Sequence, residues 1–147
     1  MKKFVFSLAK VLDFRQQTLD VKKNELAALQ AQLREVEAKI ESLNRAFAES
    51  NQKMVEEMKA GLSVLEIGNY KFYFHSIDME IKQCLKHKCG LEEAISEKKA
   101  GILAINSEIS GLEKLKDKQL QEYWKTARKC EELAVEEFVS RSRCATS

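Results

Sequence analysis

Two cysteines and a histidine form the densest group of side chains that could bind a metal: Cys84, His87 and Cys89. Cys84 and His87 would share one face of a helix, whereas Cys89, five residues from Cys84, would point well away from it. A structural zinc site needs about four converging ligands, and no second cluster in the sequence supplies the fourth. The spacing favours packing over metal binding, and we expect no metal and no other cofactor.

Groups that could catalyse a reaction are equally sparse. The chain has two histidines, His75 and His87, and lacks both a Gly-rich phosphate loop and a Ser/His/Asp or Cys/His arrangement in its usual context. Paired long helices also offer no concave pocket that could exclude water. We therefore expect a protein that is not an enzyme and that acts by contacting other proteins.

Composition favours long helices and a protein that acts away from nucleic acids and lipids. The 147 residues include five glycines and no proline, the residue that most strongly breaks a helix interior. The net charge is only +2, which disfavours the concentrated basic face that nucleic acids bind. Lys10 and Asp13 interrupt the apolar N-terminal run, so it is not expected to be a signal peptide. No stretch approaches the ~20 apolar residues of a membrane span, and we expect no lipid insertion and a cytoplasmic location with reduced cysteines.

An apolar heptad repeat runs from Leu8 to Met54, with apolar residues at eleven of its fourteen positions. A seam of this length, with charged residues between its members, predicts a coiled coil. Its polar members are Arg15, Lys22 and Ser50. Long basic side chains can lie along a seam with their charge in water; alternatively, Arg15 marks a recognition point. The positions are Leu8, Leu12, Arg15, Leu19, Lys22, Leu26, Leu29, Leu33, Val36, Ile40, Leu43, Phe47, Ser50 and Met54.

The first repeat stops near Gly61, a residue that can take the left-handed conformation that ends a helix. Ser63 and Glu66 then match a capping box, which opens a helix. The predicted fold class is all-α, a long antiparallel two-helix coiled-coil hairpin. Its expected elements are helix one at about 6–60, a turn within about 61–69, helix two at about 64–140 and a tail at 141–147, in a single domain spanning 1–147.

A second seam begins at Ile67 and predicts that helix two overhangs helix one at its C-terminal end. Folding the chain about the turn sets Leu8 opposite about 116–122, so later residues would have no partner helix. Tyr123 and Trp124 on this overhang either pack locally or contact another protein. The seam comprises Ile67, Tyr70, Phe74, Ile77, Ile81, Cys84, Lys88, Leu91, Ile95, Lys98, Ile102, Ile105, Ile109 and Leu112 and, after a stutter, Lys116, Leu120, Tyr123, Ala127, Cys130 and Ala134.

Aromatic residues gather just after the predicted turn, at Tyr70, Phe72, Tyr73 and Phe74. The seam uses Tyr70 and Phe74, which leaves Phe72 and Tyr73 on other faces. Exposed aromatic surface at such a place often marks an interaction site. The alternative is that these rings fold over the turn and cap the hairpin.

Four groups of residues, in order along nearly the whole chain, carry a resemblance to a known family. They are Met1-Lys-Lys-Phe4-Val-Phe6-Ser-Leu8 with Val11, Leu12 and Arg15; Asn69-Tyr70 with Tyr73 and Ile77; the run from Leu112 to Gln119; and Glu132-Leu-Ala134. In this order they resemble FliJ, a family of flagellar export proteins. Glu132 replaces the aspartate usual in the family and preserves its charge.

The resemblance implies a coiled-coil stalk, similar to that of rotary ATPases, needed for flagellum assembly and motility. Its implied partners are the hexameric export ATPase FliI, the export gate FlhA and export chaperones. The protein would meet them at the cytoplasmic face of the membrane, and it is expected to be a monomer when alone. The gate contact would use Tyr73 and Ile77, with Tyr70 and Phe72 beside them. The stalk analogy places the terminal end in the ATPase ring, which assigns to it Phe4, Arg15, Tyr123, Trp124 and Arg128.

Other interpretations stay open at this point. Packing within the seam is the alternative for Ile77, whereas Tyr73 lies off the seam. The chain could be the equivalent stalk of a virulence-type secretion system, or its seam could pair between two chains in an obligate dimer. It could also be a scaffold or nucleic-acid-binding coiled coil that uses the basic residues Lys114, Lys116, Lys118, Lys125, Arg128 and Lys129, although acidic residues interleave with them.

Overall fold

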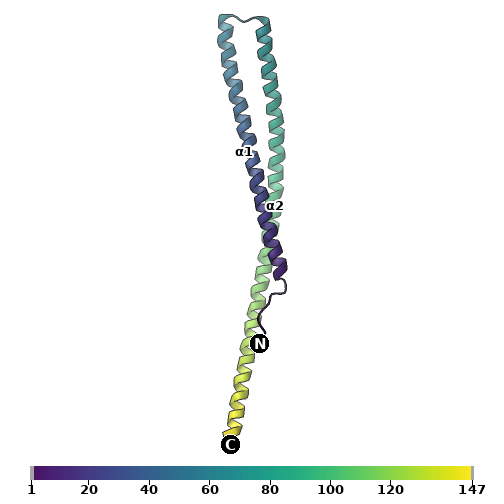
Figure 1. The fold of residues 1–147 in the computed structure, drawn as a ribbon, viewed down its shortest axis with the longest axis vertical. Coiled ribbons are helices and arrows are strands. Elements are labelled where there is room, and N and C mark those ends of the chain that lie inside the picture. The colour runs from purple at the N-terminus through teal and green to yellow at the C-terminus, as the bar shows by residue number, and fades with distance from the viewer. Residues whose placement is uncertain (1, 147) are drawn as a thin grey trace. The chain divides into compact units, whose positions relative to one another are not determined.

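The chain folds as two long α-helices joined by a short turn, in a computed structural model that describes residues 2–146 (Figure 1). Helix α1 runs over Ala9–Ala60 and helix α2 over Val64–Thr146. No strand occurs within the described range. The predicted fold class, an all-α antiparallel hairpin, is confirmed.

Contacts divide the chain into two compact units. The turn unit comprises Lys22–Gly101, and the terminal unit joins the chain up to Val21 with the chain from Ile102 onward. Each unit pairs a stretch of α1 with a stretch of α2. The expectation of one domain over the whole chain stays a prediction.

The helix ends differ from those expected at both termini. Helix α1 begins at Ala9 instead of near residue 6, because Phe6 leaves the helical path and is buried against Leu12, Ile105 and Ile109. Helix α2 continues to Thr146 instead of ending near residue 140. No glycine or proline follows Gly111 to stop it, so the expected tail at 141–147 is helical as far as residue 146.

The turn consists of only three residues, 61–63, and local chemistry explains it. Gly61 has a φ of 100°, a left-handed conformation that side chains disfavour. Ser63 and Glu66 form the expected capping box: the Ser63 N–H donates to Glu66 Oε2 at 3.3 Å, and the Glu66 N–H donates to Ser63 Oγ at 3.2 Å. The rest of the predicted turn, up to residue 69, belongs to α2.

Burial follows the two predicted seams closely. Every position of the second seam from Ile67 to Leu112 is buried or half-buried, and so is every position of the first seam except Phe47. Phe47 still contacts Phe74, with ring centroids 4.9 Å apart. In the predicted continuation, Leu120, Tyr123 and Ala127 are half-buried as expected, whereas Lys116, Cys130 and Ala134 are exposed.

Basic residues in the seam form ion pairs with the opposite helix. In the turn unit Lys98 pairs with Glu25, and Lys88 Nζ lies 3.7 Å from Glu37 Oε1. From Glu25 to Glu37 the residue number rises along α1, while the number of the paired lysine on α2 falls from 98 to 88, as it must in an antiparallel pair. The hydrogen bond from Lys98 lowers the pKa of Glu25 below its usual value. Exposed ion pairs contribute little stability, so we infer that these pairs mainly set the alignment of α1 against α2.

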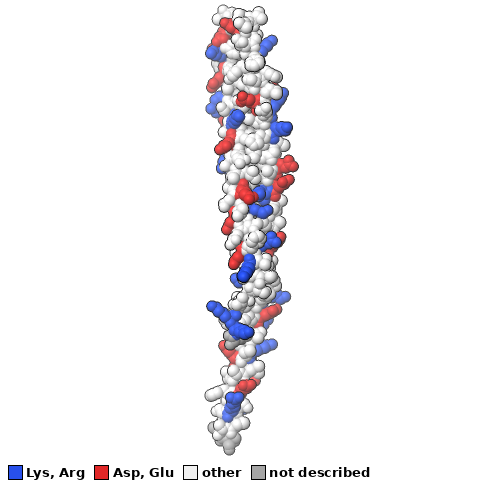
Figure 2. Space-filling model, turned by 45° about the vertical axis from the view of Figure 1, so that its right-hand side comes forward, with Lys and Arg blue, Asp and Glu red and all other residues white. Residues whose placement is uncertain are grey.

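The surface mixes both signs of charge. Basic and acidic side chains are interspersed on the face drawn in Figure 2. Within residues 2–146, neither helix contains an apolar stretch sufficient to cross a lipid bilayer.

Candidate protein-binding surfaces

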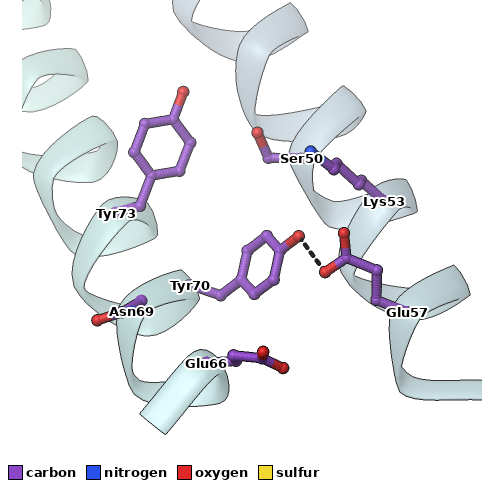
Figure 3. Close-up of a pocket in the computed structure, with 7 residues that line it drawn as sticks. All are labelled: Ser50, Lys53, Glu57, Glu66, Asn69, Tyr70 and Tyr73. Carbon is purple, nitrogen blue, oxygen red and sulfur yellow. Dashed lines mark hydrogen bonds between the residues drawn. The ribbon is translucent and has the colours of Figure 1, made fainter. Parts of the chain in front are cut away.

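A shallow pocket of about 400 Å³ lies between α1 and α2 near the turn (Figure 3). Tyr70 and Tyr73 extend from α2 toward it, facing Glu57 and Lys53 on α1. Its lining therefore mixes aromatic surface with charged and polar groups, a combination typical of protein-contact sites. The lining residues are Ser50, Lys53, Glu57, Glu66, Asn69, Tyr70 and Tyr73.

Tyr70 is held in place by contacts within the chain. Its hydroxyl donates a hydrogen bond to Glu57 Oε2 at 2.7 Å, and its ring stacks on Phe74 with centroids 6.1 Å apart. The bond to the Glu57 carboxylate is the main cause that raises the pKa of Tyr70 to about 12, because it stabilises the neutral phenol. Tyr70 thus links the two helices and forms one wall of the pocket.

Because of the Tyr70–Glu57 hydrogen bond, we expect Tyr70 to ionise at a higher pH than an ordinary tyrosine. One of the three tyrosines should ionise with a pKa of about 12, and Glu57→Gln should move this pKa back toward 10. A pKa raised by folding means that the bond stabilises the fold fully below about pH 10 and that this contribution is lost as the pH rises through about 12. Phenolate absorbance against pH measures both changes. Glu56→Gln is the control, and an unchanged titration in Glu57→Gln would contradict the assignment.

The residues expected at the gate contact do not share one surface. Tyr73 is 42% exposed at the edge of the pocket, and Phe72 is 77% exposed on a different face of α2. Ile77 is only 4% exposed and lies within the seam. The alternative that both rings fold over the turn is wrong for Phe72, and packing explains Ile77.

In the terminal unit, the non-helical N-terminal segment lies against α2 (Figure 1). The Phe4 and Tyr123 rings are 5.5 Å apart, and the Tyr123 hydroxyl donates to the Lys2 carbonyl oxygen at 2.6 Å. This segment covers α2 as far as Tyr123 without forming a helix, and α2 overhangs α1 at its C-terminal end as expected. Phe4 and Tyr123, both expected to contact the ATPase, contact each other, and their role at the ATPase stays a prediction.

The other expected residues of the terminal end differ in how accessible they are. The Arg15 guanidinium lies 3.0 Å from Glu108 Oε2 in an ion pair between the helices. Trp124 and Arg128 are exposed, although the Trp124 ring meets Tyr123 edge-on at 5.6 Å. From residue 128 to 145 every α2 residue is exposed, including Val135 and Phe138. This stretch is the most exposed part of α2.

Two exposed apolar stripes were missed by reasoning from the seams. One lies on α1 in the terminal unit at Val11, Phe14 and Val21; the other lies on α2 in the turn unit at Leu65, Phe72 and Met79. Apolar residues at helical spacing but off the seam were the signal that could have revealed both stripes.

The described residues contain no group of three or more His, Cys, Asp or Glu side chains arranged to hold a metal. Cys84 is buried in the apolar cluster with Val36 and Leu91, whereas Cys89 is exposed. The cysteine and histidine cluster of the sequence is therefore divided between the interior and the surface.

Comparison with known protein families gives a match that spans nearly the whole chain. The model of a family described as "Flagellar FliJ protein" matches residues 4–144. No curated protein and no solved structure matches the chain.

Proposed function

Because this chain belongs to the FliJ family, a family of non-catalytic flagellar export components, we propose that it links the export ATPase to the export gate. Its two units support this proposal, since each carries a separate exposed surface that is suited to protein contacts. The resemblance found in the sequence is confirmed at the level of the family, which favours a flagellar stalk over a virulence-type one.

We place the contact with the gate protein FlhA at Tyr73 and the pocket beside it. Tyr73 is the accessible aromatic residue of this pocket, and Tyr70 forms a rigid wall through its bond to Glu57. Phe72 faces elsewhere, and Ile77 supports the site from within the seam. A half-exposed tyrosine at a pocket edge can bury a ring and still hydrogen-bond, which is why tyrosine often contributes strongly to interfaces.

We place the contact with the ATPase FliI at the exposed part of α2 that follows Tyr123. Trp124 and Arg128 are exposed there, and both residue types often contribute strongly to interfaces. Phe4 and Tyr123 hold the N-terminal segment beside them, while Arg15 pairs with Glu108. The protein would act at the cytoplasmic face of the membrane, and the exposed apolar stripe on α1 is a candidate surface for export chaperones.

Tyr73→Ala tests the gate contact. We expect affinity for the cytoplasmic domain of FlhA to fall by about tenfold or more, because truncating a tyrosine that acts as an interface hot spot costs about 2 kcal/mol or more. Helicity and melting temperature should stay unchanged, since Tyr73 is off the seam. Calorimetric titration measures the affinity. Leu85→Ala, an exposed residue outside the pocket on the same helix, should bind normally; unchanged binding by Tyr73→Ala would refute the assignment.

A further inference from the structure

The stripe of Leu65, Phe72 and Met79 forms a continuous outward face on the first turns of α2. The three residues are seven apart, or nearly two helical turns, so their side chains align. They are 76%, 77% and 46% exposed. At 100° per residue, Phe72 points roughly 160° away from the seam residue Phe74. The stripe is thus apolar surface that the hairpin itself does not use.

Gly68 makes a hole in this face. Leu65, Gly68, Asn69 and Phe72 have the spacing of the four residues that receive one side chain in coiled-coil packing. Glycine costs roughly 0.5–1 kcal/mol in a helix interior relative to alanine. Nothing in the surrounding fold requires it, because Gly68 does not have a positive φ and a Cβ here would meet no described atom within 4 Å. Because Gly68 has no side chain, the hole between these four residues is deeper than it would be with any other residue at this position.

The two edges of the stripe differ in charge. One edge carries the basic residues Lys82 and Lys86 together with His75, and the other carries Asn69, Ser76 and the acidic Glu80. Lys82 Nζ lies 3.0 Å from Asp78 Oδ2, but both side chains are largely exposed, and such pairs contribute little. The basic edge therefore remains able to attract an acidic partner.

We propose that the Leu65–Phe72–Met79 face docks a single amphipathic α-helix of a partner protein. The docked helix inserts an apolar side chain at Gly68 and carries acidic residues along the edge that meets His75, Lys82 and Lys86. This site adjoins the Tyr73 pocket, with which it shares Asn69, and it does not depend on the proposed function. It gives the turn unit a second docking surface, on the outward face of α2.

A partner helix fits this face better than a second copy or a lipid surface. Two copies docked antiparallel through the stripe would set the basic edge of each against that of the other, which is unfavourable. Asp78 and Glu80 near the stripe would be repelled by anionic lipids, and three large side chains are a narrow face for membrane binding. A helix with an acidic edge would cover the apolar stripe and place its acidic residues next to the basic edge.

Two synthetic three-heptad helical peptides test the proposal with the full chain. Both have a leucine seam; along the edge that would meet His75, Lys82 and Lys86, one carries glutamates and the other carries lysines. Fluorescence anisotropy should show that the glutamate-edged peptide binds at least about tenfold more tightly, and that salt reduces the difference. Phe72→Ser should weaken binding about tenfold or more and leave the fold intact, because Phe72 is exposed.

Gly68→Ala separates docking from stability. It should raise the melting temperature, since alanine favours the helix, yet weaken peptide binding about threefold or more by filling the hole. Gly111→Ala, also in open space, should raise the melting temperature without changing binding, and Tyr73→Ala should leave binding unchanged.

Several outcomes would overturn the proposal. Equal binding of the two peptides would show that the basic edge does not select an acidic partner. Binding unaffected by Phe72→Ser would show that the peptide binds another surface. A dimer in sedimentation that Phe72→Ser abolishes would assign the face to a second copy. Co-sedimentation with anionic vesicles that Phe72→Ser abolishes would assign it to lipid.

Discussion

Ile77→Ala is expected to lower the free energy of unfolding by about 2–4 kcal/mol, because it removes a well-buried aliphatic side chain from the seam and leaves a cavity. Ile77 is 4% exposed, less than any other buried residue of the described core. The midpoint of chemical denaturation, followed by circular dichroism, measures the loss.

The same substitution decides whether Ile77 supports the gate site or contacts the gate itself. Ile77→Val keeps most of the packing, so it should cost only about 1 kcal/mol and retain gate binding. Leu85→Ala, at an exposed position of the same helix, should change stability much less. If Ile77→Ala abolished gate binding with unchanged stability, the side chain would have to become exposed in the complex, and our assignment to packing would be wrong.

Phe6→Ala should destabilise the terminal unit by about 3–4 kcal/mol, the usual cost of truncating a buried phenylalanine. Phe6 is 5% exposed and packs with Leu12, Ile105 and Ile109, although it lies outside α1. Amide hydrogen exchange should accelerate over about residues 102–112, where α2 loses its apolar cover.

The neighbouring residue provides a matched control for Phe6. Val5 is 78% exposed, so Val5→Ala should leave exchange and stability almost unchanged. Loss of the Phe6 anchor should also release Phe4 from Tyr123 and make the N-terminal segment sensitive to protease. Equal exchange in Phe6→Ala and Val5→Ala would show that the segment does not hold the terminal unit together.

The candidate sites were only partly predictable from sequence. The aromatic group after the turn was evident, but the division of Phe72 and Tyr73 onto different faces needed the packing of α2. Ile77 matched both the family pattern, which implies a contact with the gate, and the seam pattern, which implies packing. Only its burial in the structure favoured packing. The contact of Phe4 with Tyr123 was not predictable, because it joins residues far apart in the chain through a non-helical segment.

Local sequence patterns were sufficient to predict the two helices, their seams and the turn. Heptad spacing, the left-handed Gly61 and the Ser63–Glu66 capping box act over a few residues, so their consequences can be read locally. The tertiary structure alone decided that Phe6 leaves the helix to fill the core beside Ile105 and that the Leu65–Phe72–Met79 face stays uncovered. Such outcomes depend on which distant side chains compete for the same buried space, and local spacing carries no information about that competition.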